Sequence, residues 1–269
     1  MRYNGNVAHQ MPAQPDLSKL SVGQFAERFR SEMIPLSNTF SYFCASVPLS
    51  EEDLKEYLEE PIASLPPAIS SLLPKVSIML VPYLERVDGK EKGSGHRDEF
   101  VCTEKPPQSR LSLATQVQFD NEEVLLFALK DQDVSEYHYR FYHVLAALAG
   151  NLWTEETQIQ YCTLLREELN AGVHGEVDEE SWHRKQGLLR RQTNVRKETK
   201  VFREYAQQSL IDTLTLYLHG ICCDIDVETG PRQLPSRHLR KRLNLLHALF
   251  PPPSGYAVFP EHQKPVEQS

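Results

Sequence analysis

The strongest constraint on the fold is the run 201–223, VFREYAQQSLIDTLTLYLHGICC, whose apolar side chains cover most of a helical surface. At about 100° per residue, these apolar positions span well over half of the helical wheel. A helix with so wide an apolar surface is normally surrounded by other elements, so we expect it to be the hub of the molecule. Five polar residues form a narrow strip with spacings of 4, 4, 3 and 4: Glu204, Gln208, Asp212, Thr215 and His219.

Composition narrows the class of protein. The 269 residues carry a net charge of −8, which favours solubility and argues against a general nucleic-acid binder. No run reaches the roughly 18–20 apolar residues of a membrane span, and the first residues lack the apolar core of a secretory signal. Five scattered cysteines are typical of reduced thiols, so we expect a cytoplasmic protein. They are Cys44, Cys102, Cys162, Cys222 and Cys223.

Strand patterns concentrate in the first half of the chain. Short apolar runs there predict an antiparallel β-meander of about four strands, preceded by a short aromatic strand at 40–47. Pro82 indicates an edge strand or a bulge, and Asp120 followed by Asn121 indicates a tight turn. The four predicted strands of the meander are 75–85, 99–104, 111–119 and 123–130.

Helix patterns dominate from residue 134 onward. Ser21 with Gln24 and Ser50 with the acidic run after it predict two earlier helices, the second ending at Pro61. Strands followed by helices favour an α+β fold in which a C-terminal helical layer covers the sheet. The predicted later helices are 135–149, 155–170, one that begins after Asp178, 201–223 and one that Ser236 caps.

This pattern predicts one large domain. We expect a disordered arm over 1–17, a single α+β domain over 18–258 and a loose tail over 259–269. Within the domain, helices and sheet occupy 18–133 and the helical layer occupies 134–258.

The polar strip is the leading catalytic candidate. The chain has no GxGxxG, GxxxxGK[ST], GxSxG, CxxC or HExxH motif, which removes the most recognisable enzyme classes. If the strip lines a cleft, His219 is a base or ligand and Asp212 a carboxylate that orients it. The alternative is that the strip is simply the side of the helix that faces water.

Metal binding is a second hypothesis, although the sequence requires no cofactor. A divalent ion is the cofactor that the His and Cys residues suit, and His219 with Cys222 has a zinc-like spacing. His174 and His183 are the other candidate ligands. His138 and His143 are five residues apart, about 140° around a helix, so one ion would not take both.

Basic residues suggest a partner-binding surface. They attract acidic proteins or anionic ligands, and without interleaved aromatic side chains they do not favour nucleic acid. We therefore expect a non-enzymatic binding or regulatory protein with an acidic partner. The alternatives are a hydrolase-like, metal-assisted enzyme and a nucleic-acid-binding protein. The candidate contact residues are Arg184, Arg190, Arg191, Arg196, Lys197, Arg240, Lys241 and Arg242.

Overall fold

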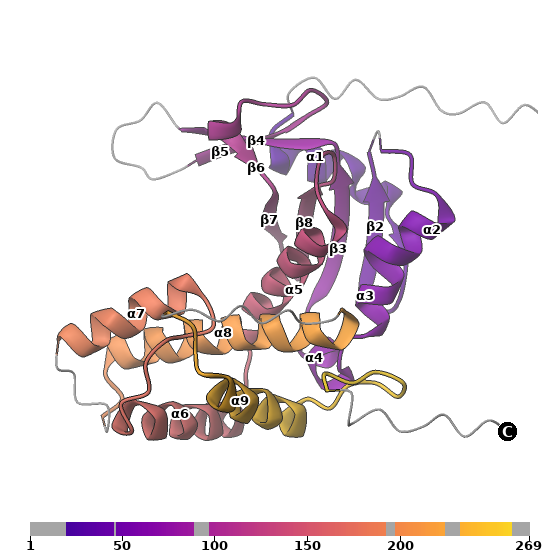
Figure 1. The fold of residues 1–269 in the computed structure, drawn as a ribbon. Coiled ribbons are helices and arrows are strands. Elements are labelled where there is room, and N and C mark those ends of the chain that lie inside the picture. Colours follow the sequence, from indigo (N-terminus) through magenta and orange to yellow (C-terminus); the bar gives the residue numbers. More distant parts are fainter. Residues whose placement is uncertain (1–19, 46, 89–96, 192–196, 224–231, 260–269) are drawn as a thin grey trace, which may run out of the picture. The chain divides into compact units, whose positions relative to one another are not determined.

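The chain divides into two compact units, described here from a computed structural model (Figure 1). Unit 1 consists of Met1–Pro48 and Lys75–Asp131, and unit 2 of Leu49–Pro74 and Gln132–Ser269. The expected arm and nearly all of the expected tail lie outside the described residues. That the two units make one domain, with the helices covering the sheet, stays a prediction. The described residues are 20–45, 47–88, 97–191, 197–223 and 232–259.

Unit 1 contains a mixed five-stranded sheet, in the order β1-β2-β3-β8-β7, and a separate antiparallel sheet, in the order β5-β4-β6. In the larger sheet, β2, β3 and β8 are parallel, and β1 and β7 are antiparallel to their neighbours. The strands are β1 (Ile34–Pro35), β2 (Phe40–Cys44), β3 (Lys75–Val81), β4 (Tyr83–Asp88), β5 (Arg97–Cys102), β6 (Leu111–Ser112), β7 (Ala114–Phe119) and β8 (Glu122–Ala128).

The α+β class is confirmed, but the antiparallel meander is wrong. The run predicted as one strand at 75–85 breaks at Pro82 into β3 and β4, which belong to different sheets. The central strands β3 and β8 are buried along nearly their whole length, and such continuous apolar strands are typical of parallel pairing. The predicted turn after β7 is present, and Asp120 there has a φ of 45°.

One face of the larger sheet packs on α1 (Val22–Phe29). Ser21 and Gln24 form the predicted capping box, which fixes the start of this helix. The completely buried ring of Phe25 and the stacked rings of Phe29 and Phe43 lie in the shared apolar core, together with Met79 and Leu126 of the sheet.

Unit 2 is helical, and each later predicted helix is present with small shifts in its ends. The long helix α8 packs against α5, α6, α7 and α9, and 14 of its 23 residues are buried, so its expected role as a hub is confirmed. The helices are α2 (Glu51–Leu54), a π-helical stretch η2 (Lys55–Glu59), α3 (Glu60–Ala63), α4 (Pro67–Leu72), α5 (Val134–Gly150), α6 (Glu155–Asn170), α7 (Glu179–Arg190), α8 (Lys200–Cys222) and α9 (Ser236–Leu249).

The prediction that Pro61 ends its helix is wrong. The Ser50 capping box starts the helix, which then continues through Pro61 to Ala63. The π-helical stretch precedes the proline, and at its end the Glu60 amide donates to the Lys55 carbonyl, five residues back. This wider turn lets the ring of Pro61 fit without ending the helix.

Among the described residues, every helix is too short or too polar to cross a membrane.

Candidate functional site

The candidate site lies where the C-terminal end of α8 meets α5 and the α2–α3 segment. Small side chains let α5 and α8 approach closely: Ala146 and Ala149 are buried, and a Cβ on Gly150 would lie 3.0 Å from Ile211 of α8. The same face of α5 carries His138, which is only 6% exposed, toward the end of α8.

Three potential metal ligands meet at this point. The ligand atoms of His138, Cys222 and Cys223 all lie within 4.8 Å of one another. Among the described residues, this is the one group of three or more histidine, cysteine or acidic side chains close enough to hold an ion. Both cysteines are half-buried, so the cluster is neither sealed in the core nor fully exposed.

The hydrogen bonds of His138 fix which ring nitrogen faces the sulfurs. Its Nε2 lies 2.9 Å from the Glu56 carbonyl oxygen, which only accepts, so Nε2 carries the hydrogen. Nδ1 therefore presents its lone pair, and it lies 3.3 Å from Cys223 Sγ. A histidine whose second nitrogen donates to a backbone carbonyl is the usual arrangement of a metal ligand.

The Glu56 carbonyl is available to His138 because of the π-helical stretch. In an α-helix the Glu60 amide would donate to Glu56, but here it donates to Lys55. The next amide in a π-helical pattern belongs to residue 61, a proline, which has no N–H. Two local irregularities thus leave one acceptor open, and His138 fills it.

Tyr142 and Ser64 form the polar surroundings of Cys222. The Tyr142 hydroxyl lies 2.9 Å from Ser64 Oγ and 3.2 Å from the Pro61 carbonyl oxygen. Hydrogen bonding with Cys223, assisted by Tyr142 and the nearby His138, outweighs burial and lowers the pKa of Cys222 to about 6. The lowered pKa favours the thiolate form of Cys222.

Asp212, one residue of the predicted catalytic pair, has a structural role in this fold. It is 2% exposed and accepts hydrogen bonds from the Ser181 amide at 3.2 Å and Gln208 Nε2 at 2.9 Å. Ser181 is in the first turn of α7, so the carboxylate caps that helix together with its N-cap residue Asp178. Burial raises the pKa of Asp212 despite both hydrogen bonds.

His219, the other member of that pair, makes no hydrogen bond to Asp212 among the described residues. Its ring contacts the edges of Tyr139 and Tyr142, and its buried Nε2 has no hydrogen-bond partner within the described part of the chain. Burial and the neighbouring His138 lower the pKa of His219, so the ring is neutral. A catalytic role for the two residues stays a prediction.

Of the four predicted metal ligands, only Cys222 belongs to the cluster. His174 is exposed in the connection before α7, and His183 is exposed with its Nε2 3.4 Å from Glu179. The structure therefore does not bring either histidine to the sulfurs.

The predicted basic surface is only partly present, and the placement of Arg242 on it is wrong. Arg240 lies over the ring of Phe259, and Lys241 is paired with Glu167 at 2.7 Å. Exposed Arg190, Arg191 and Lys197 form no ion pair among the described residues, and Arg196 lies outside those residues. Arg242 is completely buried, so it presents no charge to a partner.

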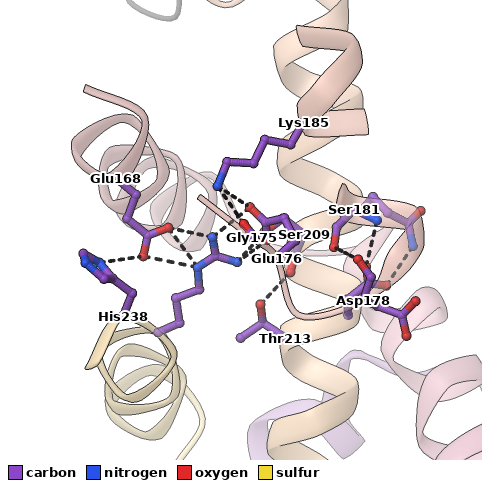
Figure 2. Close-up of polar contacts among 12 residues, drawn as sticks. Glu168, Gly175, Glu176, Asp178, Ser181, Lys185, Ser209, Thr213 and His238 are labelled. Carbon is purple, nitrogen blue, oxygen red and sulfur yellow. Dashed lines mark hydrogen bonds and ion pairs between the residues drawn. The ribbon is translucent and has the colours of Figure 1, made fainter. Parts of the chain in front are cut away.

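Arg242 of α9 instead belongs to a buried ion network that connects α6, α7, α8, α9 and the loop before α7. Figure 2 shows its Glu168, Glu176 and Lys185 side chains. It binds Glu168 of α6 at 2.6 Å and Glu176 at 2.7 Å. Glu176 also binds Lys185 of α7 at 3.2 Å and accepts from Tyr205 of α8. Two acids and two bases thus balance within the core, which is why these charges tolerate burial.

The backbone beside this network is shaped by one glycine. Gly175 has a φ of +76°, and a Cβ there would collide with the Gln233 carbonyl. This close approach brings Glu176 to the Arg242 guanidinium, and the Gly175 carbonyl itself accepts from Lys185 at 2.8 Å.

His138 and Cys223 were not among the predicted site residues. The small residues Ala146, Ala149 and Gly150 mark the face of α5 that meets α8. His138 lies on that face, opposite the adjacent cysteines that end α8. Combining the small-residue face with this cysteine pair would have indicated the cluster.

Comparison with protein-family models, curated proteins and solved structures finds no match to this chain.

Proposed function

We propose that this chain is a non-enzymatic binding protein whose ligand is a thiophilic metal ion, Zn²⁺ or Cu⁺, held by Cys222, Cys223 and His138. The observation that carries the proposal is the convergence of two sulfurs and an imidazole lone pair within 4.8 Å. Sulfur and imidazole donors together select these ions over Mg²⁺ or Ca²⁺, which prefer oxygen.

The spacing of the donors supports one shared ion. Zn–S and Zn–N distances are about 2.3 Å and about 2.0–2.1 Å, so two donors on one trigonal or tetrahedral ion lie roughly 3.5–4 Å apart. The three ligand atoms lie within 4.8 Å of one another, so an inward shift of up to about 1 Å would bring them to this range. Three protein donors complete a trigonal Cu⁺ site or leave one position of a tetrahedral Zn²⁺ site for water.

The local charge also favours a cation. Metal binding requires deprotonated sulfur, and the pKa of Cys222, lowered to about 6, supplies a thiolate at neutral pH. His138 is held in the tautomer that offers Nδ1, because Glu56 takes the hydrogen on Nε2.

Metal titration of the reduced full chain tests the proposal. We expect one equivalent of Zn²⁺ or Cu⁺ to bind, and Co²⁺ as a spectroscopic probe to give sulfur-to-metal charge-transfer absorption. Metal at about 100 times its Kd would raise the free energy of unfolding by about 2.7 kcal/mol. Cys222→Ser and His138→Asn should each weaken binding at least tenfold.

Cys162→Ser is the matched control, because Cys162 is a buried cysteine of α6 outside the cluster and should not affect metal affinity. Equal metal affinity in the wild type and in Cys222→Ser/Cys223→Ser would refute the proposal.

A second proposal concerns an acidic protein partner at the end of α7. Arg190, Arg191 and Lys197 are exposed and unpaired among the described residues, whereas other predicted basic residues are engaged within the chain. Arg190→Glu/Arg191→Glu should elute from an anionic resin at clearly lower salt than the wild type. Arg28→Glu/Lys75→Glu, at two exposed bases of unit 1, makes the same change in net charge and is the control, and equal elution of both variants would contradict the proposal.

A further inference from the structure

The two adjacent cysteines differ from the other three in their surroundings. Cys102 and Cys162 are buried, and Cys44 is half-buried in a sheet strand without a second thiol beside it in sequence. Cys222 and Cys223 are neighbours at the end of a helix, are both half-buried, and have their sulfurs within 4.8 Å of each other. A thiol beside a second thiol and partly open to solvent is the typical arrangement of an oxidation-sensitive pair.

His138 supplies the other group that such chemistry needs. Its unprotonated Nδ1 lies 3.3 Å from Cys223 Sγ, so it accepts the hydrogen of the Cys223 thiol. The Tyr142 hydroxyl, 2.9 Å from Ser64 Oγ, lies on the side of Cys222. The two sulfurs therefore have different neighbours: the Tyr142 hydroxyl lies on the side of Cys222, and Cys223 has the His138 base beside it.

We propose that Cys222 and Cys223 form a peroxide-sensitive switch, in which hydrogen peroxide converts the pair into a disulfide between neighbouring residues. The disulfide removes both sulfur donors of the metal site. The oxidation depends on the two thiols alone, and only its effect on the metal rests on the proposed function.

The reaction proceeds in two balanced steps. The Cys222 thiolate attacks one oxygen of hydrogen peroxide, the O–O bond breaks, and the departing hydroxide is protonated to water, which leaves a sulfenic acid on Cys222. Cys223, having passed its proton to His138 Nδ1, then attacks the Cys222 sulfur. The S–O bond breaks, and this second hydroxide takes the proton from His138 and leaves as water. Overall, two thiols lose two electrons and peroxide is reduced to two waters.

The backbone makes the oxidised state distinct from the reduced one. Neighbouring Cα atoms are about 3.8 Å apart, closer than the roughly 4.4–6.8 Å of an ordinary disulfide. The ring therefore needs a changed backbone at 222–223, where the Cys223 amide donates to the His219 carbonyl at 2.8 Å. Oxidation should break this last hydrogen bond of α8, and the strained bond should be easily reduced again.

Mass spectrometry of the metal-free full chain after peroxide treatment tests the inference. We expect the loss of two hydrogen atoms, mapped to the peptide containing 222–223 and reversed by dithiothreitol. Cys223→Ser should stop at a sulfenic acid that dimedone traps on Cys222, and Cys222→Ser should give neither product. Cys162→Ser should behave as the wild type does.

His138→Asn separates the two steps. Dimedone labelling of Cys222 should appear at the wild-type rate or faster, while disulfide formation should slow at least tenfold because Cys223 has lost its base. If peroxide oxidised Cys44 or Cys102 while Cys222 and Cys223 remained free thiols, the inference would be overturned. Direct oxidation of Cys222 to sulfinic acid without any disulfide would overturn it as well.

Different experimental outcomes would refute the redox switch and the proposed metal site. With Zn²⁺ bound, disulfide formation should slow, and peroxide should release the ion in step with the disulfide, as followed with a chromogenic indicator. Reversible disulfide formation in a chain that binds no metal would support the switch and refute the metal site. Metal binding without any disulfide formation would support the metal site and refute the switch.

Discussion

Two polar clusters contact helix α8, and they differ in burial and in the kind of groups that they hold. In the first, Arg242 and Lys185 meet Glu168 and Glu176, all are buried, and every charge has an opposite charge within 3.2 Å. In the second, His138 Nδ1 and the sulfurs of Cys222 and Cys223 lie within 4.8 Å of one another, and both cysteines are only half-buried.

This difference gives the two clusters different roles, the ion network in stability and the thiol cluster in ligand binding and thiol chemistry. A closed ion network leaves no group for a ligand, and its removal leaves uncompensated charge in the core. The thiol cluster keeps its sulfur atoms partly open to solvent. The comparison predicts that mutations in the first cluster change the free energy of unfolding, whereas mutations in the second change ligand affinity and thiol reactivity.

The largest expected effect is that of Arg242→Met. Removing the guanidinium leaves Glu168 and Glu176 buried without their main partner, so the free energy of unfolding should fall by about 3–5 kcal/mol in chemical denaturation. Lys241→Met, at the adjacent exposed residue paired with Glu167, should cost less than about 1 kcal/mol. Equal losses in the two variants would show that the buried network is not a stabilising element.

The next largest effect is the pH dependence that Glu176 gives to the free energy of unfolding. Burial by itself would raise the pKa of this carboxyl, but Arg242 and then Lys185 override it and lower the pKa to about 2 from 4.5. A lowered folded-state pKa adds stability above about pH 4.5, and this stability is lost as the pH falls toward about 2.

Denaturation of the wild type and Glu176→Gln across this pH range measures that contribution. Their difference in free energy of unfolding should be about 3 kcal/mol near neutrality and should shrink on acidification. Exposed Glu167→Gln should show only a small difference throughout. A difference between wild type and Glu176→Gln that is constant with pH would contradict the assigned role of Arg242.

A smaller effect is expected from Pro61→Ala, which acts on the thiol cluster from a distance. Alanine supplies an amide that donates to the Glu56 carbonyl and competes with His138 Nε2 for it. Loss of this supporting hydrogen bond should weaken Zn²⁺ or Cu⁺ affinity about tenfold in a competition titration. Pro67→Ala, at the start of α4, is the control and should leave the affinity unchanged, whereas equal affinities of all three chains would contradict the role of Pro61.

The smallest effect is that of Tyr142→Phe on thiol reactivity. Without the hydroxyl, the pKa of Cys222 should rise from about 6 toward its usual 9.0. Alkylation by iodoacetamide at neutral pH should then slow roughly two- to threefold, and the pH midpoint of the rate should move upward. Tyr217→Phe removes a buried hydroxyl that bonds to the Phe250 carbonyl instead, so an equal shift there would contradict the assignment.

The local signals in the sequence were sufficient for most helices. The capping boxes at Ser21 and Ser50 and the N-cap at Thr154 mark helix starts that the structure confirms. Such signals involve residues three or four apart, so the sequence alone carries them. The wide apolar surface of 201–223 likewise predicted the hub, because burial on many sides leaves few polar positions.

Pairings between distant residues could not be predicted in this way. β3 pairs in parallel with β8, although β4, β5 and β6 of the other sheet lie between them in the sequence. No short-range pattern indicates this pairing. Arg242 appeared to be one of several surface bases because its two acidic partners are 66 and 74 residues away. His138 and Cys223, 85 residues apart, were missed for the same reason.

The π-helical stretch Lys55–Glu59 has a consequence for the helical phase of everything that follows it. A five-residue step delays that phase by one position, or about 100°, relative to a regular α-helix. Deleting a single residue from this stretch would turn Pro61 and Ser64 away from the Tyr142 hydroxyl and would close the Glu56 carbonyl to His138. The surroundings of both cysteines therefore depend on the one extra residue that the π-helical turn contains. For this cluster, the length of the segment matters more than its composition.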